Sequence, residues 1–255
     1  MARIKLSFEK YRRNEVYKKR IRILSAASFI LGIFLGMMFY GMATWADFEA
    51  SLFDTSIKSD DSLKSLRCPI VIGPSQEAVI AATIRNTLDR KNLISIRASF
   101  SDGYITLMRQ DDQRLTLEPG EITKLEWPFT AKDAVWDRVV MARVTQARSY
   151  PEPSKSGSCG ILLINFLGLN GNWTTAIWLG ITFLLLISGL VIWSQINQPL
   201  KGRPADAFKA MLALSLVVST GILIMFVGVW MLALLVLLIN FLLVLSMAGY
   251  FILYS

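Results

Sequence analysis

The last part of this chain excludes charged side chains. Residues 210–255, a stretch of 46 positions that begins AMLALSLVVS, contain no Asp, Glu, Lys or Arg. One membrane crossing needs about 20 apolar residues, so this stretch is long enough for two. We predict a hairpin of two transmembrane helices, residues 210–229 and 230–254, that turns near Gly228 because glycine tolerates tight turns. A segment that enters the membrane and returns at an angle is the alternative.

Two earlier stretches have the same uncharged, apolar character. Residues 23–44 and residues 172–194 are each long enough for one crossing, which brings the prediction to four transmembrane helices. The first stretch follows a basic segment, as a signal peptide does, but its apolar run exceeds the about 7 to 15 residues usual there. We therefore expect it to be retained as an uncleaved signal-anchor.

Basic residues beside these helices predict the topology. Residues 1–22 carry nine basic and two acidic side chains, and residues 195–209 carry three basic and one acidic. Residues 45–172 are nearly neutral, with 15 basic and 16 acidic side chains. Because basic residues near the ends of spans stay in the cytoplasm, we expect residues 1–22, residues 195–209 and the C-terminus inside, and residues 45–172 outside.

The net charge of +8 and the pI near 9.6 would otherwise indicate nucleic-acid binding. Here the excess charge lies beside the predicted helices, so we predict no nucleic-acid partner. The basic cluster at residues 18–22, KKRIR, is placed to attract anionic lipid, at about 1 kcal/mol per charge.

Four of the seven tryptophans fall at predicted membrane boundaries: Trp45, Trp173, Trp193 and Trp230. Indole rings prefer the interface between membrane and water. We therefore predict that these four side chains lie at headgroup level.

Between residues 68 and 171 the pattern changes to an alternation of apolar and polar positions, which is typical of half-buried strands. The alternating runs are residues 77–88, 92–100, 104–109, 113–118, 122–129 and 138–145, with end strands at 68–73 and 159–166. Turn residues such as Asp102-Gly103 separate them. We predict an antiparallel β-sandwich without helices, joined to the first transmembrane helix by a polar stalk over residues 45–67.

The stretch LTLEPGEITKLEW, residues 115–127, resembles the turn and strand common in bacterial immunoglobulin-like modules. The resemblance implies an immunoglobulin-like sandwich, and because one fold serves many functions it implies no particular activity. The expected fold class is an α-helical transmembrane protein with four spans and an all-β, immunoglobulin-like extracytoplasmic domain.

The two cysteines of the chain, Cys68 and Cys159, bracket the predicted sandwich. An oxidising compartment outside the cytoplasm permits a disulfide between them. Closing a loop of this length would stabilise the fold by up to about 4 to 5 kcal/mol. Two reduced thiols that act as small apolar side chains are the alternative.

Residues suited to catalysis are scarce. The sequence has no histidine, which excludes Ser-His-Asp and Cys-His catalysis and histidine-ligated metals. Two cysteines cannot build a cysteine-rich zinc or iron–sulfur site. The carboxylate pairs Asp60-Asp61 and Asp111-Asp112 fall in predicted loops, where we interpret them as solvated. We therefore predict no cofactor, no metal and no catalytic residue.

Small and polar residues mark helix-packing positions within the predicted spans. Ser28, Gly32 and Gly36 recur every four residues, which forms a ridge that lets helices approach closely. Asn240 lies in the middle of the last predicted helix, and its amide is expected to bond another helix. Its partner is predicted to be Ser215, Ser219 or Thr220 of the hairpin, or a residue of another protein.

These features lead to a functional hypothesis: a non-catalytic structural subunit of a larger membrane complex. Its sandwich would dock an extracytoplasmic protein by strand addition at a sheet edge. The Ser28–Gly36 ridge and Asn240 would pack against other integral membrane subunits. The alternatives are a pore or transport protein that forms a homo-oligomer around an uncharged lumen, since no charge lies within a predicted span, and an enzyme acting on lipid or envelope material through Asp111 and Asp112.

Overall fold

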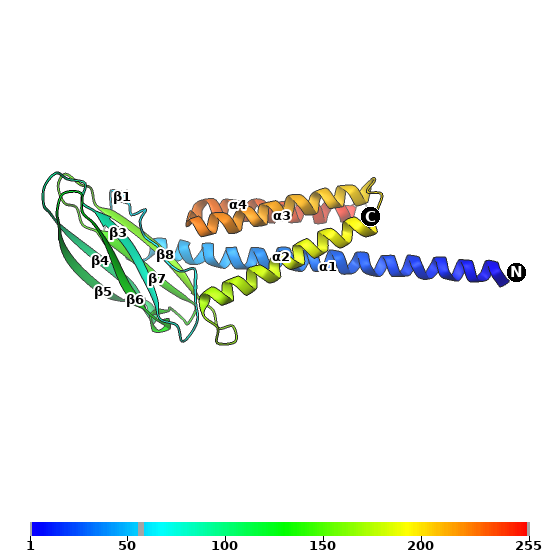
Figure 1. Cartoon of the computed structure of the whole chain (residues 1–255), viewed down its shortest axis with the longest axis horizontal. Coiled ribbons are helices and arrows are strands. Elements are labelled where there is room, and N and C mark those ends of the chain that lie inside the picture. Colours follow the sequence, from blue (N-terminus) through cyan, green and yellow to red (C-terminus); the bar gives the residue numbers. More distant parts are fainter. Residues whose placement is uncertain (1, 56–58, 254–255) are drawn as a thin grey trace. The chain divides into compact units, whose positions relative to one another are not determined.

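The computed structural model describes residues 2–55 and 59–253, which divide into two compact units. The helical unit comprises the described residues of Met1–Tyr40, Ile177–Ile224 and Leu232–Ser255. The sheet unit comprises those of Gly41–Ala176 and Met225–Met231. Figure 1 labels the helices and most strands of both units.

Four long helices form the helical unit, and some of their ends belong to the sheet unit. They are α1 (Ala2–Leu52), α2 (Gly171–Ile196), α3 (Arg203–Val227) and α4 (Trp230–Leu253). Among the described residues, four helical segments are long and apolar enough to cross a membrane: Val16–Leu52, Gly171–Ile196, Arg203–Val227 and Trp230–Gly249. The four candidate spans predicted from the sequence are therefore confirmed as helices.

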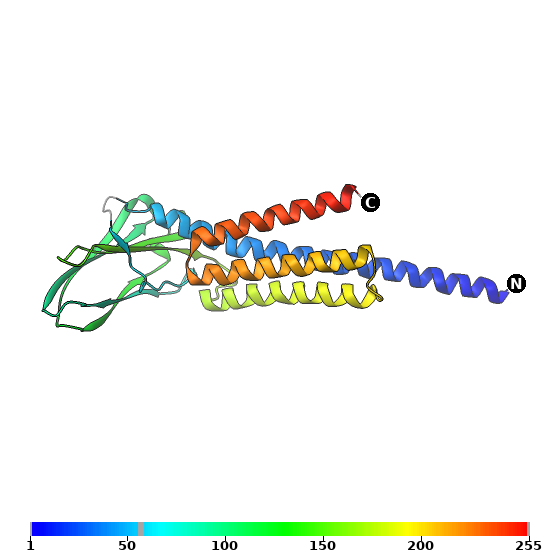
Figure 2. The ribbon, with the colours of Figure 1, turned by 90° about the horizontal axis from the view of Figure 1, so that it is seen from above.

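The local sequence explains where these helices begin and turn. Asn170 caps α2, because its side-chain oxygen accepts a hydrogen bond from the backbone N–H of Trp173 at 3.0 Å. Pro204 suits the first turn of α3, where a backbone N–H would have no helical acceptor. α3 and α4 run in opposite directions (Figure 2), and the turn between them contains Gly228 at φ = +76°. The loop between α2 and α3 is shorter than the predicted 195–209, because α3 already begins at Arg203.

The polar stalk predicted at residues 45–67 is wrong in its first part, because α1 continues without a break through Leu52. Ala43, Ala46, Ala50 and Phe53 are buried. Their spacing of three or four residues places them on one face of a helix. The polar residues between them give this stretch the composition of a linker. Residues 56–58 of the predicted stalk lie outside the described residues.

The strands of the sheet unit form two sheets. Sheet A has the order β1-β8-β7-β4-β5, with β2 also paired to β8, and sheet B pairs β3 with β6. The strands are β1 (Asp61–Ser62), β2 (Val71–Ile72), β3 (Ala78–Arg85), β4 (Asn92–Asp102), β5 (Tyr104–Leu117), β6 (Ile122–Phe129), β7 (Val139–Gln146) and β8 (Lys155–Leu163).

This arrangement differs from the predicted antiparallel, helix-free sandwich in three respects. β1 and β2 pair with β8 in parallel, so sheet A is mixed. Residues 104–117 form one long strand rather than two, because Gln110–Gln113 pair with residues 96–99 of β4 instead of turning. A short 3-10 helix, η1 (Ala131–Asp133), connects β6 to β7.

The two sheets share one hydrophobic core. Along β3 and β6 every second residue is buried, and the same holds for the first part of β4. Large side chains from both sheets fill the core, among them Ile80, Trp127 and Phe129 of sheet B with Ile96 and Phe100 of sheet A. Burial of one such side chain contributes roughly 1.5–3 kcal/mol. The period-two alternation of the sequence is thus explained by one core that lies between two sheets.

Candidate interaction surfaces

The end of α1 packs on the face of sheet A that is turned away from the shared core. Ala50 and Phe53 of α1 form a small cluster with Val135 and with Met141 of β7. At Gly160 of β8 the two backbones approach so closely that a Cβ would lie 2.1 Å from the carbonyl carbon of the facing α1 alanine. Only glycine is compatible with this contact.

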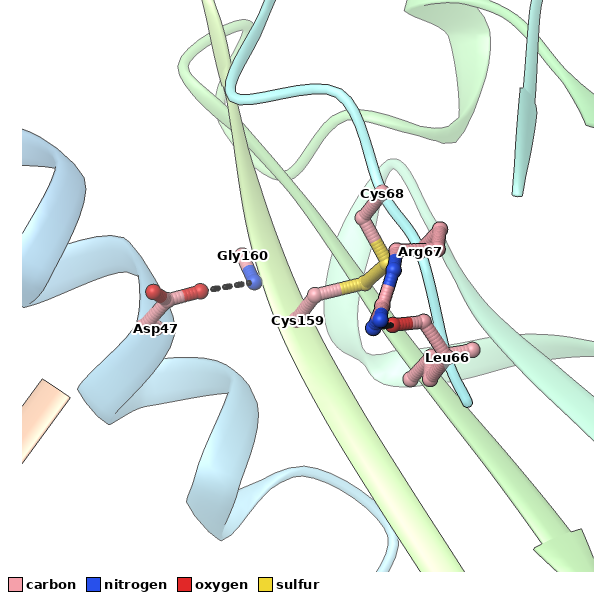
Figure 3. The surroundings of a disulfide bond; sticks show 6 residues. All are labelled: Asp47, Leu66, Arg67, Cys68, Cys159 and Gly160. Atoms are coloured by element: carbon pink, nitrogen blue, oxygen red, sulfur yellow. Dashed lines mark hydrogen bonds between the residues drawn. A yellow bond between two sulfur atoms is a disulfide. The ribbon is translucent and has the colours of Figure 1, made fainter. Parts of the chain in front are cut away.

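Two carboxylates near the C-terminal end of α1 add polar contacts with sheet A. The backbone N–H of Gly160 donates a hydrogen bond to the carboxylate of Asp47 at 2.9 Å (Figure 3). The hydroxyl of Ser99 on β4 donates to the carboxylate of Asp54 at 2.7 Å. The stretch predicted to be a loose stalk is therefore fixed to the sheet by apolar and polar contacts.

Cys68 and Cys159 form a disulfide, as the sequence predicted. Cys159 lies on β8, and Cys68 lies in the segment that connects β1 to β2. Figure 3 shows the bond beside the contact between Gly160 and Asp47. The predicted role as a clamp between the two ends of the sheet section agrees with this position, since the bond spans a sequence separation of 91.

A gap in strand pairing lies beside the disulfide. β1 pairs with β8 as far as Ser156, and β2 begins to pair at Leu162, so the eight residues 63–70 run past only the five residues 157–161. The longer segment bulges away from β8 and borders a hollow of about 750 Å³, which we call the edge hollow. Its walls are β8, residues 62–70, two residues of α1, and Met225–Trp230 at the turn between α3 and α4.

A second surface lies at the turn between β4 and β5. Tyr104 is exposed there, and the backbone N–H of Trp136 donates to the carbonyl of Gly103 at 3.4 Å. The Trp136 side chain is 62% exposed. We call Tyr104 and Trp136 the tip patch. Exposed aromatic side chains gathered at one place are typical of protein interfaces.

The backbone at the tip patch is strained. Trp136 and Asp137 have φ values of +50° and +53°, in the left-handed region that residues other than glycine rarely adopt. Such positions cost of order 1–3 kcal/mol and are concentrated at functional sites. The sequence patterns did not predict this surface. The available signal was Trp136 itself, a tryptophan outside every predicted strand and membrane boundary.

The ridge of Ser28, Gly32 and Gly36 contacts helices of the same chain. The hydroxyl oxygens of Ser28 and Ser188 lie 3.1 Å apart. A Cβ on Gly32 would lie 3.0 Å from the backbone of α2, and a Cβ on Gly36 would lie 2.6 Å from Cγ1 of Val218 on α3. The hypothesis that this ridge packs against a partner subunit is therefore corrected, because α2 and α3 occupy it.

Asn240 is fully buried and bonds α1 rather than α3. Its Nδ2 donates a hydrogen bond to the hydroxyl of Tyr40 at 3.1 Å. The predicted partners Ser215 and Ser219 instead donate their hydroxyls to backbone carbonyls one turn earlier in α3. Asn240 thus ties α4 to α1 within the helical unit and is not available to a partner subunit.

The four predicted interface tryptophans have different surroundings. Trp45 and Trp173 are exposed. The Nε1 of Trp193 donates to a backbone carbonyl in the first turn of α3 at 3.1 Å. The ring of Trp230 packs edge-on against Phe48, with 5.5 Å between ring centroids. Their place at headgroup level stays a prediction.

The basic cluster at residues 18–22 lies on α1, where Lys18, Lys19, Arg20 and Arg22 are exposed. The side chains of the other basic residues of 1–22 lie outside the described part of the chain. Binding of anionic lipid by this cluster stays a prediction.

The carboxylate pair Asp111-Asp112 lies within β5 rather than in the predicted loop. Asp112 faces Arg97 of β4, and its carboxylate accepts from the Arg97 Nε at 2.7 Å. This hydrogen bond and the charge of Arg97 hold the pKa of Asp112 below its usual value. Asp112 is therefore explained as one half of a cross-strand ion pair.

In the other pair, Asp61 belongs to β1 and Asp60 directly precedes it. The carboxylate of Asp60 accepts hydrogen bonds from the hydroxyl and the backbone N–H of Ser154, at 2.8 and 3.1 Å. These hydrogen bonds lower the pKa of Asp60. Within residues 2–55 and 59–253, no group of three or more His, Cys, Asp or Glu side chains is arranged to hold a metal ion.

Neither protein-family models nor curated proteins match this chain. Among solved structures, 36% of the chain is similar to 12% of a Bacteroides uniformis beta-glucuronidase, at 15% identity and a TM-score of 0.29. A CARDB domain from Pyrococcus furiosus, in complex with di-metal ions, matches 40% of this chain over 90% of its own length, at 12% identity and a TM-score of 0.33. A Listeria innocua beta-glucosidase matches 40% of the chain over 15% of its own length, at 15% identity and a TM-score of 0.29. The chain thus spans about an eighth of the glucuronidase, and these similarities assign no activity to it.

Proposed function

We propose that this protein is a non-catalytic interaction subunit of a larger integral membrane complex, and that the tip patch and the outer edge of β5 dock an extracytoplasmic protein. The observation that carries the proposal is Trp136. Its large side chain is exposed, its backbone is held in a strained conformation, and it lies beside the turn that opens the edge strand.

Strand addition supplies the mechanism of docking. β5 is the outermost strand of sheet A and extends over 14 residues. Within residues 59–253 its outer edge has no neighbouring strand, so its backbone groups there are open to a partner strand. Charged residues in the second half of the strand, such as Asp111 and Asp112, disfavour pairing with unspecific strands. Trp136 and Tyr104 are the side chains that would anchor a specific one.

The proposal includes a membrane topology and a fold family. Residues 1–22 and the C-terminus would be cytoplasmic, and the sheet unit would be an extracytoplasmic, immunoglobulin-like sandwich. The excess of basic residues in 1–22 and 195–209 supports this orientation, and the disulfide is compatible with an oxidising outer compartment. The core shared by the two sheets supports the sandwich.

Native purification with a paired variant tests the docking surface. The full-length protein is extracted from its own membranes in mild detergent, and co-eluting proteins are quantified by mass spectrometry. We expect at least one partner in fixed ratio with the wild type, and a loss of about tenfold or more in the double variant Trp136→Ser/Tyr104→Ser. The control is Ile122→Ser, which removes an equally exposed apolar side chain from β6 in sheet B.

Two results would contradict the proposal. One is a wild-type protein that elutes alone, and the other is a partner that the double variant retains at the wild-type ratio. The topology is tested separately by Lys132→Cys, an exposed position near the tip patch. A membrane-impermeant maleimide should label this cysteine in intact cells, and labelling only after lysis would reverse the proposed orientation.

A further inference from the structure

We propose that the edge hollow binds the phosphodiester headgroup of a membrane phospholipid. Three kinds of lining group meet there: cationic side chains that form no ion pair, open backbone groups of β8, and apolar residues at the ends of two candidate spans. This binding would be separate from docking at the tip patch and from the basic cluster at residues 18–22.

Lys64 and Arg67 supply the positive charge of the hollow. Both residues line it, and among the described residues neither forms an ion pair. The Nη1 of Arg67 donates to the carbonyls of Lys64 and Leu66, each at 2.9 Å, which fixes the guanidinium beside the disulfide (Figure 3). Its Nε and Nη2 have no acceptor within the described chain. An arginine held in this way is prepared for two parallel hydrogen bonds to phosphate oxygens.

The free edge of β8 supplies backbone groups. Along this edge Ser156 accepts from Leu63, Gly160 donates to Asp47, and the N–H of Leu162 donates to the segment before β2. Backbone groups that point the same way recur at every second residue of a strand. The N–H of Ser158 therefore also points into the hollow, and no acceptor within the described residues takes it. A phosphate oxygen in the hollow would accept this hydrogen bond.

The charges around the hollow balance those of one phosphodiester. The ionisable side chains that line it are Lys64, Arg67 and Asp47, so their sum is one positive charge. Asp47 is already bonded to Gly160 (Figure 3), which leaves the two cations to meet the ligand. One phosphodiester carries one negative charge and would neutralise the site.

The apolar part of the lining favours a lipid over a soluble phosphate compound. Met225–Trp230 contribute to the wall, and they include the last residues of one candidate span and the first of the next. Leu63 and Leu66 line the same hollow from the segment that bulges away from β8. A glycerol backbone and the first methylenes of acyl chains would be in contact with these side chains. The hollow, at about 750 Å³, also has the size usual for sites of small ligands.

Native mass spectrometry of the full-length protein in mild detergent tests the proposal with three probes. Dihexanoyl phosphatidylglycerol carries both phosphate and acyl chains, glycerol 3-phosphate carries only the phosphate, and dihexanoylglycerol carries only the chains. We expect the first to bind at least about tenfold more tightly than either of the others. Arg67→Gln and Lys64→Gln should each weaken its binding by about tenfold. Arg114→Gln, an exposed arginine on β5 outside the hollow, should leave it unchanged.

Each contrary result overturns a stated part of the proposal. Equal binding of glycerol 3-phosphate would assign the hollow to a soluble phosphate compound, and equal binding of dihexanoylglycerol would remove the role of the cations. Unchanged binding in both Arg67→Gln and Lys64→Gln would place the lipid elsewhere on the chain. Lys64 is exposed, so its substitution separates loss of binding from loss of folding.

Discussion

The long helix α1 makes close contacts in both units, and glycines permit them in each. In the helical unit Gly32 and Gly36 of α1 let side chains of α2 and α3 approach its backbone, and Gly189 of α2 lets Phe29 of α1 approach in return. In the sheet unit the glycine belongs to the strand, and α1 presents Ala46 to Gly160. Both contacts depend on a missing side chain, but they are held by different forces.

The difference reflects the surroundings of each contact. Lipid is as apolar as leucine, so helices within a membrane gain little from burial and depend on close fit and a few hydrogen bonds. The pair of Asn240 and Tyr40 is such a bond. At Gly160, by contrast, the contact combines hydrophobic burial, a carboxylate contact and a nearby disulfide. The sheet unit should therefore depend most on its crosslink and its burial, and the helical unit on individual polar contacts.

The largest expected effect is the removal of the crosslink. Cys68→Ser/Cys159→Ser should lower the free energy of unfolding of the sheet unit by about 3 to 5 kcal/mol, because the open chain regains the entropy of a loop with a sequence separation of 91. Chemical unfolding of the full-length protein in detergent measures this. Wild-type protein treated with a reductant is the control and should reproduce the loss. A change below about 1 kcal/mol would show that contacts alone hold the sheet unit.

Gly160→Ala should have the next largest effect. The added Cβ would lie 2.1 Å from backbone atoms of Ala46, so the end of α1 must shift, at a cost of about 1–3 kcal/mol. The matched control is Gly180→Ala on α2, where a Cβ meets no atom within 4 Å. Thermal unfolding of both variants distinguishes them. Equal stability of the two variants would mean that α1 does not pack on β8 as described.

The contact between Asn240 and Tyr40 should contribute less. A double-mutant cycle of Asn240→Leu and Tyr40→Phe isolates the coupling between them, which is expected to be about 0.6 to 1.7 kcal/mol. The cycle is needed because each side chain is deeply buried and its replacement changes packing as well as the hydrogen bond. Unfolding in a range of detergent and denaturant ratios gives the free energies of unfolding of the wild type, the two single variants and the double variant. A coupling of zero would assign the position of α4 to packing alone.

The smallest expected effect concerns acid stability of the sheet unit. Asp60 is exposed, and hydrogen bonds from Ser154 lower its pKa below that of the unfolded chain. A carboxylate with a lowered pKa contributes stability above the unfolded pKa of about 3.9 and loses it as the pH falls through the folded pKa. Ser154→Ala should therefore lower the free energy of unfolding slightly at pH 7. It should also make this free energy fall less steeply as the pH drops below about 4. Asp60→Asn, which cannot titrate, should show the same flattening, and a steeper decline in either variant would contradict this role.

Much of the fold follows from patterns that are local in sequence. The exclusion of charge from residues 210–255 predicts two helices, and the glycine at 228 lies where they turn. Alternation predicts the core-facing residues of β3, of β6 and of the first part of β4, because mainly one side of each is buried. The disulfide was predicted because two cysteines bracket the sheet section.

The features that were missed depend on contacts between distant residues. The alanines at 46 and 50 look like part of a linker until sheet A is present to bury them. Gln110–Gln113 have the composition of a turn, and only pairing with β4 makes them a strand. Asn240 could be recognised as a bonding position, but Tyr40 lies 200 residues away in sequence. The tip patch combines Tyr104 at the start of β5 with Trp136 in the segment before β7, so no single stretch predicts it.

The continuity of α1 from Ala2 to Leu52 has a geometric consequence. Each residue of an α-helix advances the chain by about 1.5 Å and rotates it by about 100°. Within the sheet unit, Ala46, which faces Gly160, and Ala50, which packs with Met141, are therefore locked in angular phase. Insertion of one alanine between Ala46 and Ala50 would turn one contact by about 100° against the other, whereas seven inserted residues would restore the phase to within about 20°. Changes in this stretch are thus constrained by helical phase more than by length.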